Sequence, residues 1–269
     1  MNKLSSASGT VHKAMGVLDL VAAFERPVRF NEVLEKSNFP KGTLYRMMQS
    51  LRAEGLLAYD DARQTYSLGI RLMRLAHAAW TQFSLATVAQ PYLDQLSRSI
   101  GETIHLAQLD NAQVLYVDKR NAESAVEMFS QAGKVGPAYC TGVGKAMLAH
   151  LPEIELRAAL AQQSYHRFTP KTLASPEALV AELHNIRARG FAFDDEEHEP
   201  GIICVAVPVL TAAGRVIGAI SVTSTTNKTN LAGLEKLVPE MRQATSEIAQ
   251  TAELWRFPAD QKPMEKLES

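Results

Sequence analysis

The 269-residue chain has little of what marks several large classes of protein. It has two cysteines, Cys140 and Cys204, which lie far apart and form no metal-ligand pattern, so we expect free thiols and no disulfide framework. No apolar run approaches the roughly 20 residues of a membrane-spanning helix. The opening stretch MNKLSSASGT has no apolar core of a signal peptide. We therefore expect a cytoplasmic protein that does not contact a membrane.

A strong excess of charge of one sign is also missing, because the formal net charge is −1. This near-neutral total hides an asymmetry. Residues 1–80 hold 11 lysines and arginines against 7 acidic residues, whereas the rest of the chain has a net charge of −5. A basic N-terminal part on a mildly acidic body is typical of a protein that contacts DNA with one part only. The length suits about two domains, and the 46% apolar content is sufficient for their cores.

Residues 30–52 predict two short helices separated by a tight turn. Asn31 is placed to cap the first helix. Pro40 fits the start of the second helix, because its fixed φ and its missing N–H cost little there. An ordinary pair of amphipathic helices with a solvated basic face is the alternative. The apolar residues of the second helix recur at helical spacing and should be buried: Leu44, Met47, Met48 and Leu51.

The sequence around this helix pair favours a winged helix-turn-helix domain. A helix over residues 10–24 precedes the pair, and two short strands over 56–59 and 65–68 follow it. The strands enclose a polar turn with Arg63 near its tip, where a side chain can reach the minor groove or a phosphate. The residues expected to contact phosphates and base edges are Lys41, Gly42, Thr43, Tyr45, Arg46, Gln49, Arg52 and Arg63.

A helix with a wide apolar face follows over residues 70–80, and we expect it to connect two domains. Its apolar surface can pair with a second copy of the chain, or it can pack only on its own domains. The next helix, over 84–99, contains Pro91, which predicts a kink or a restart. The predicted division is a DNA-binding domain at 8–70, a linker helix at 71–84, an effector domain at 85–256 and a tail at 257–269.

The predicted effector domain alternates strands and helices in an order typical of an α+β fold with a mainly antiparallel sheet covered by helices. The predicted strands are 102–109, 114–117, a weaker one at 125–129, 191–193, 202–210 and 216–223. The predicted helices are 141–151, 152–162, 176–189 and 231–255, with loops at 133–137 and, strongly acidic, at 194–201.

Three stretches suggest chemistry, and none has a complete motif. The segment GVGK at 142–145 is not a phosphate-binding loop, because Tyr139 and Ala146 occupy positions that need glycine and Ser or Thr. It remains a helix start that favours a small anion, or a helix packed closely on the sheet. The acidic loop is expected to be solvated rather than metal-binding. No motif pairs Cys140 with a histidine base among His105, His166 and His198. We therefore expect no metal, no cofactor and no catalytic residue.

Four segments give the chain a specific resemblance to the IclR family of bacterial transcription regulators from about residue 10 to 255. They are FPKGTLYR at 39–46, YSLG at 66–69, TGVGKAMLA at 141–149, and FDDEEH at 193–198 followed by Gly201 and Cys204. The strand ETIHL at 102–106 is also similar to the branch of the family that responds to sugar acids such as ketodeoxygluconate.

The resemblance implies a winged helix-turn-helix joined by a helix to a GAF-like effector domain, with dimers that often pair into tetramers and with small organic acids as ligands. This chain has threonine at 141 and 223, where the glyoxylate-responsive type has serine, and the extra methyl groups reshape the pocket. Carried over position by position, the effector pocket would use Met128, Phe129, Thr141, Gly142, Val143, Asp194, Cys204, Ser221 and Thr223.

We therefore expect a homodimer, or a dimer of dimers, that binds an inverted-repeat operator in double-stranded DNA and responds to a small carboxylate. A repressor of a catabolic operon fits this description best. The alternative is an enzyme or a metabolite-binding protein whose N-terminal module serves only oligomerisation. Binding to a promoter duplex that weakens steeply with salt would separate the two, because bound phosphates release counterions.

Overall fold

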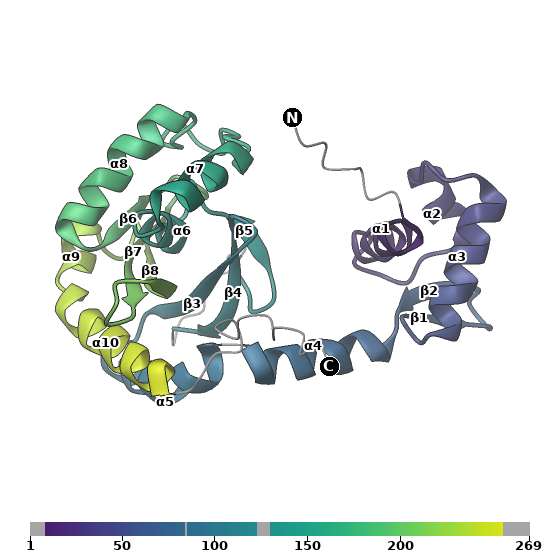
Figure 1. Ribbon diagram of the computed structural model, residues 1–269, viewed down its shortest axis with the longest axis horizontal. Helices are drawn as coiled ribbons and strands as arrows, with labels where there is room; N and C mark the ends of the chain where they lie inside the picture. Colours follow the sequence, from purple (N-terminus) through teal and green to yellow (C-terminus); the bar gives the residue numbers. More distant parts are fainter. Residues whose placement is uncertain (1–8, 84, 123–129, 255–269) are drawn as a thin grey trace, which may run out of the picture. The chain divides into compact units, whose positions relative to one another are not determined.

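The computed structural model describes residues 9–83, 85–122 and 130–254, and the chain forms two compact units divided between Gln82 and Phe83 (Figure 1). Each unit has its own apolar core. The predicted boundaries at residues 70 and 84, with a linker helix between them, are a finer division and stay a prediction. Among the described residues, no helix is both long enough and apolar enough to cross a membrane.

The N-terminal unit is the winged helix-turn-helix that the sequence predicts. Its elements are α1 (Thr10–Ala22), α2 (Phe30–Lys36), α3 (Lys41–Ala53), β1 (Leu57–Asp60) and β2 (Thr65–Leu68), followed by α4 (Ile70–Phe83). The strands β1 and β2 pair as an antiparallel hairpin. On α3 the residues at helical spacing are buried as expected, except that Met47 is only half-buried. The core also takes in Val17, Val21, Val28, Val33, Leu57 and Tyr66.

The predicted cap at Asn31 is wrong. Helix α2 begins at Phe30, so Arg29 is its N-cap and Asn31 lies inside the first turn. The cap is made instead by Glu32, whose carboxylate accepts a hydrogen bond of 2.8 Å from the Arg29 backbone N–H. A carboxylate in the first turn satisfies a free backbone donor and is favoured by the helix dipole, which explains why Asn31 is not needed there.

The end of the wing is fixed by a close approach of two backbone segments. Gly69 donates from its N–H to the Leu56 carbonyl at 2.9 Å, and a Cβ at Gly69 would lie 2.1 Å from the Gly55 carbonyl oxygen. No other residue type fits there without a shift of the backbone. The glycine of the YSLG segment therefore allows β2 to pass the end of α3 before α4 begins.

The second unit is built on one sheet of six antiparallel strands in the order β5-β4-β3-β8-β7-β6. The strands are β3 (Thr103–Asp110), β4 (Gln113–Arg120), β5 (Val135–Pro137), β6 (Ala192–Asp195), β7 (Ile202–Leu210) and β8 (Val216–Thr225). The helices are α5 (Leu85–Ile100), α6 (Gly142–Leu148), α7 (Glu153–Gln162), α8 (Pro176–Arg189), α9 (Leu231–Glu235) and α10 (Val238–Leu254).

Helices cover both faces of this sheet (Figure 1). Helix α6 packs on one face, across β8, β7 and β6, with α8 against its outer side. Helices α5 and α10 pack together and cover the other face. The predicted α+β class is confirmed, and every strand pair in the sheet is antiparallel.

Several predicted boundaries in this unit are wrong. The predicted loop at 133–137 contains β5, an edge strand that pairs with β4. The predicted helix 141–151 is shorter, because α6 ends at Leu148. The predicted final helix is two helices, α9 and α10, and residue 255 lies outside the described residues. The first two residues of the predicted acidic loop belong to β6. The predicted strand at 125–129 lies outside the described residues.

Helix α5 is continuous through Pro91 rather than restarting there. Proline removes one backbone donor and crowds the preceding turn, and this usually bends or ends a helix. Here the helix is continuous because its apolar side packs in the core of the unit. The buried residues of this side include Leu85, Val88, Ala89, Leu93 and Leu96.

Candidate functional site

The exposed side of α3 and the tip of the wing present the side chains expected to contact DNA. Lys41, Gly42, Tyr45, Arg46 and Arg52 are exposed, Thr43 is half-buried, and the Arg63 side chain is 79% exposed. The wing turn is held by Asp60, whose carboxylate accepts from the backbone N–H groups of Ala62 and Arg63. Helix α3 and the wing thus belong to one packed unit and present basic side chains at its surface.

Two of the expected contact residues are already tied to the wing. The Gln49 amide donates to the Tyr66 hydroxyl at 3.2 Å, and the Arg52 guanidinium lies 4.8 Å from the centre of the Tyr59 ring. Both side chains therefore hold the hairpin on α3, and they are less available to DNA than Arg46 or Arg63. This second role follows from the packing of the wing, which helical periodicity alone does not show.

In the second unit, strand register brings four of the predicted pocket residues together. Across neighbouring antiparallel strands, directly opposed residues share a face of the sheet. One row across the sheet runs from Asp194 on β6 through Cys204 on β7 and Thr223 on β8 to Thr103 on β3. In the next row on the same face, Ser221 of β8 lies opposite His105 of β3. Residues that are up to 120 positions apart in the sequence are therefore neighbours on one face.

Helix α6 covers this face at very short range. A Cβ at Gly142 would lie 2.5 Å from the Cys204 sulfur, and one at Gly144 would lie 2.3 Å from the Ala138 carbonyl oxygen. The glycines of the GVGK segment therefore serve close packing on the sheet. The same packing places Thr141, Gly142 and Val143 at a cavity, so the two interpretations of this segment are compatible.

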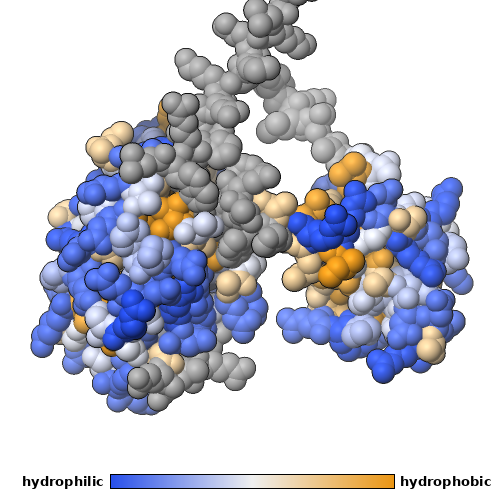
Figure 2. All heavy atoms as spheres, turned by 90° about the horizontal axis from the view of Figure 1, so that it is seen from below, coloured by the Kyte–Doolittle hydropathy of each residue, from blue (hydrophilic) through white to orange (hydrophobic). Residues whose placement is uncertain are grey.

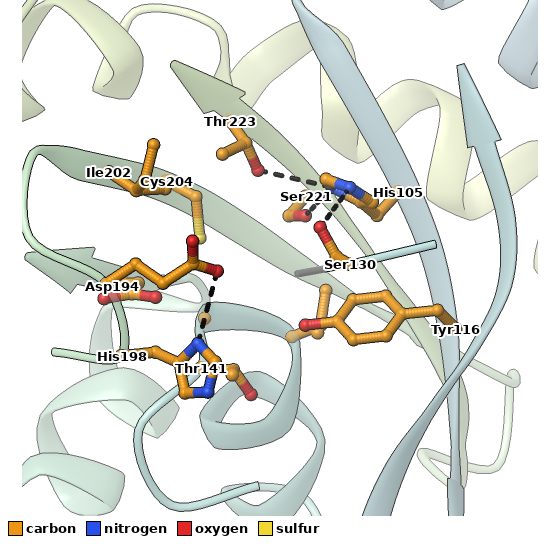
Figure 3. Close-up of a pocket in the computed structure, with 13 residues that line it drawn as sticks. His105, Tyr116, Ser130, Thr141, Asp194, His198, Ile202, Cys204, Ser221 and Thr223 are labelled. Atoms are coloured by element: carbon orange, nitrogen blue, oxygen red, sulfur yellow. Dashed lines mark hydrogen bonds and ion pairs between the residues drawn. The ribbon is translucent and has the colours of Figure 1, made fainter. Parts of the chain in front are cut away.

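The cavity measures about 40 Å³, counted as the space open to the centre of a water molecule, and Figure 3 shows the side chains around it. Seven of the nine predicted effector residues line it: Thr141, Gly142, Val143, Asp194, Cys204, Ser221 and Thr223. The other two, Met128 and Phe129, lie outside the described residues. Sequence reasoning did not place the remaining lining residues in the pocket: His105, Tyr116, Ser130, His198, Glu199 and Ile202.

Apart from Ser130, those additional residues come from elements that the sequence had already indicated. His105 and Tyr116 lie on the predicted hairpin β3–β4, and His198 and Glu199 lie in the acidic loop next to Asp194. The His198 ring nitrogen Nδ1 lies 3.5 Å from a Glu199 carboxylate oxygen. Alternation along β3 puts His105 on the same face as Thr103, but which strand pairs with β3 is not readable from spacing.

Asp194 is a buried carboxyl group in this cavity. Burial, and next the nearby Glu197, raise its pKa to about 7, although Lys145 and the Glu197 backbone N–H act in the opposite direction. That N–H donates to an Asp194 carboxylate oxygen at 2.8 Å. At neutral pH Asp194 is therefore divided between a form that can donate a hydrogen bond and a form that can only accept.

The lysine of the GVGK segment forms a buried ion pair with Glu197. The Lys145 side chain is 1% exposed and its ammonium group donates to a Glu197 carboxylate oxygen. The other Glu197 oxygen is buried and has no hydrogen-bond partner among the described residues. This lysine is therefore a structural cation behind the cavity rather than a ligand for phosphate.

The two thiols are not activated nucleophiles. Burial raises the pKa of both Cys140 and Cys204 well above the ordinary value, and the carboxyl group of Asp194 raises both further. A thiol in an apolar, acidic surrounding stays protonated and unreactive. No cluster of three metal-binding side chains occurs within 9–83, 85–122 and 130–254.

Both parts of the chain match known proteins. The family model described as IclR helix-turn-helix domain matches residues 10–61, and the model described as Bacterial transcriptional regulator IclR C-terminal matches residues 77–250. This chain belongs to the IclR family of bacterial transcriptional regulators. As a member of that family it is an HTH-type transcriptional regulator that binds DNA.

Individual relatives agree with this assignment. The regulator XynR of Escherichia coli is 33% identical over 235 residues, which cover 87% of this chain and 93% of XynR. The regulator KdgR of the same organism is 31% identical and covers 93% of this chain and 94% of KdgR. A solved IclR homologue from Microbacterium hydrocarbonoxydans, complexed with 4-hydroxybenzoate, has a TM-score of 0.78 at 23% identity, covering 91% of this chain and 100% of its own. At that identity the likeness concerns the fold.

Proposed function

We propose that this IclR-family regulator is a repressor that releases its operator when a small organic or sugar-derived acid enters the cavity beneath α6. The observation that carries the proposal is the cavity itself, in which hydroxyl, imidazole and carboxyl groups from three strands meet the start of α6. A cavity lined by polar side chains in an otherwise apolar core costs folding free energy, and a ligand that uses those groups accounts for them.

A carboxylate is the ligand class that we propose. Ser221 and Thr223 lie on the same strand and face, and the Tyr116 ring completes the wall beside them (Figure 3). Hydroxyl groups can donate to an anion in a site where water is scarce, and a protonated Asp194 can donate as well. The 4-hydroxybenzoate complex of the Microbacterium homologue shows that this fold can hold an aromatic acid in that protein. The family resemblance supports the same class here.

The geometry of the N-terminal unit supports a dimeric repressor on an inverted repeat. Figure 2 shows apolar surface on the N-terminal unit, and its exposed large apolar residues include Val11 and Met15 on α1, and Ile70 and Met73 on α4. Exposed apolar side chains of this number on one small unit favour contact with another protein surface. We propose that the surface pairs with a second copy, so that two recognition helices reach half-sites about one helical turn apart.

Two measurements test this function together. A thermal-shift screen with pyruvate, glyoxylate, gluconate and 4-hydroxybenzoate should give at least one acid that raises the melting temperature, because a ligand of the folded state stabilises it. Fluorescence anisotropy on a duplex from the protein's own promoter region should then show that this acid lowers the affinity for DNA. Tight binding that the acid leaves unchanged would contradict the repressor mechanism, because a ligand must distinguish two states to shift them.

The acid found in the screen also allows a test of whether the protein is an enzyme. We propose that it is not, and that it acts in the cytoplasm on DNA. The buried thiols have raised pKa values, and the imidazole that contacts the Ser130 hydroxyl in the cavity, His105, has its pKa lowered to about 3 by burial, which makes it a weak general base. Unchanged acid recovered after long incubation at high protein concentration supports the regulator. Steady turnover would favour the enzyme alternative instead.

A further inference from the structure

His105 lies at the centre of a cluster of hydrogen bonds. Which partner donates in each of these bonds depends on which ring nitrogen carries the proton. It is 2% exposed and lies on β3, directly opposite Ser221 of β8. Its Nε2 lies 2.8 Å from the Ser130 hydroxyl. Its Nδ1 lies 3.4 Å from the Ser221 hydroxyl and 3.3 Å from the Thr223 hydroxyl. Figure 3 shows the contacts of the ring with the hydroxyls of Ser130, Ser221 and Thr223 as dashed lines.

The ring is neutral, so its two nitrogens have opposite roles. Burial, and next the positive charge of Lys119, lower the pKa of His105 to about 3. A neutral imidazole carries one proton, and therefore one nitrogen donates and the other accepts. The tautomer decides whether the ring donates a hydrogen bond to Ser221 and Thr223 or accepts one from a hydroxyl group of these residues.

We propose that His105 carries its proton on Nδ1 and, by donating to both hydroxyls of β8, turns the hydroxyl hydrogens of Ser221 and Thr223 toward the cavity, where they select an acceptor such as a carboxylate. His105 is then a positioning residue for the effector. The selection of the effector rests on the function proposed above for the cavity, whereas the tautomer itself does not.

The lengths of the contacts support this tautomer. The 2.8 Å contact at Nε2 lies within the range of a hydrogen bond that a hydroxyl donates. The two longer contacts at Nδ1 match a single N–H shared between two acceptors.

The position of Lys119 supports the same tautomer. Lys119 lies opposite His105 on β4, and its ammonium group donates to the Ser130 carbonyl oxygen at 3.0 Å. The cation is therefore on the Nε2 side of the ring, and β8 is on the Nδ1 side. A positive charge disfavours a proton on the nearer nitrogen and favours one on the farther nitrogen.

The consequence for ligand choice follows from counting hydrogens. With the proton on Nδ1, both hydroxyls of β8 are acceptors toward the ring, and each keeps its own hydrogen for a ligand. With the proton on Nε2, at least one hydroxyl must donate to Nδ1, and its oxygen lone pairs then face the cavity. The first arrangement suits an anion, and the second suits a ligand with N–H or O–H groups.

The test is the ring-nitrogen NMR spectrum of the full chain labelled with ¹⁵N-histidine, with the His105 signals assigned by their loss in His105→Gln. We expect the pattern of a neutral ring with protonated Nδ1 at pH 7. A ring protonated mainly at Nε2, or on both nitrogens, would overturn the proposal. This spectrum is measured without DNA and without a ligand. The tautomer and the repressor function are therefore tested independently, and either proposal can be wrong while the other is right.

A matched pair of variants tests the role of Ser130. Ser130→Ala removes the donor to Nε2, and the population should shift measurably toward the Nε2-protonated ring. Ser221→Ala removes one of the two acceptors at Nδ1 and leaves Thr223, so the ring should stay protonated at Nδ1. An unchanged spectrum in Ser130→Ala, or a reversed tautomer in Ser221→Ala, would show that other groups set the proton.

Discussion

The two units of this regulator bury different kinds of side chain. Among its described residues, the N-terminal unit buries apolar side chains and Tyr66, and the polar side chains expected to contact DNA are exposed or half-buried. The second unit buries polar and charged groups, among them His105, Lys145, Asp194 and Glu197. Burial of such groups costs free energy unless they are paired, so this difference supports the proposal that the second unit holds a ligand in its interior.

The ion pair behind the cavity gives the largest expected effect. Lys145→Met leaves the buried Glu197 without its cation, and this should destabilise the second unit by about 3–5 kcal/mol. Hydrogen exchange of peptides from α6 and β7 measures the loss locally, while the exchange of α3 serves as the internal control. Adding Glu197→Gln removes the unpaired charge and should recover much of the stability. A double variant as unstable as the single one would show that the loss is one of packing.

The pH dependence of stability tests the buried carboxyl group. The pKa of Asp194 is raised to about 7 in the folded protein, so the folded state holds this proton more tightly than the unfolded state. Stability from this group is therefore full below the ordinary pKa near 4 and is lost as the pH rises to about 7. Asp194→Asn keeps the acceptor for the Glu197 N–H but cannot ionise.

In melting curves, the advantage of Asp194→Asn over the original protein should be small at pH 4.5 and reach several degrees at pH 8, since 1 kcal/mol corresponds to roughly 2–4 °C in a unit of this size. A constant difference between the two proteins over this range would contradict the raised pKa. The N-terminal unit provides the contrast, because its described interior offers no carboxyl group to titrate.

Effector binding should depend on one face of β8 and not on the other. Ser221→Ala should weaken binding of the acid found in the screen by roughly 1.5–3 kcal/mol, the cost of a hydrogen bond to a charged group. Calorimetric titration measures this, and DNA affinity without ligand should stay nearly unchanged. Ser224→Ala is a matched control on the same strand, because Ser224 is buried but does not line the cavity. Equal losses in both variants would place the ligand elsewhere.

This contrast also explains how far the sequence could predict the molecule. Helical spacing and turn residues are local signals, and they correctly indicated the winged helix-turn-helix with Leu44, Met48 and Leu51 in its core. The polar cavity depends on long-range pairing. The resemblance supplied Asp194, Cys204, Ser221 and Thr223 by position, whereas the cluster of His105 with Ser130 and β8 needed the strand order.

Boundaries were the least predictable feature, because a single contact outside the pattern can decide where an element begins or ends. The cap at Asn31 was wrong because a carboxylate one residue later reaches the backbone of Arg29. The strand β5 was predicted as a loop because Val135–Pro137 is short and contains glycine and proline, and an edge position tolerates both. In both cases a contact between residues that the pattern does not connect decided the structure.

On the surface side of the comparison, Arg46→Ala should weaken operator binding by about 1–3 kcal/mol if this residue reads a guanine edge. Its side chain is exposed on α3, so the melting temperature should not change. Anisotropy titrations on operator and on a scrambled duplex separate lost specificity from lost charge. Arg157→Ala, an exposed arginine on α7 in the second unit, controls for the change in net charge. Unchanged operator affinity would mean that α3 is not the recognition helix.

The wing should show the smallest effect, and one of a different kind. Arg63 is more exposed than any group of the cavity, and its nearest carboxylate oxygen, on Asp60, is 3.9 Å away. A phosphate contact adds affinity without reading sequence, so Arg63→Ala should weaken binding to operator and scrambled duplex by the same factor. Each released phosphate contact should also reduce the slope of log affinity against log salt by about 1. A change in preference between the two duplexes would instead place Arg63 on a base edge in the minor groove, and the wing would then share the reading of sequence with α3.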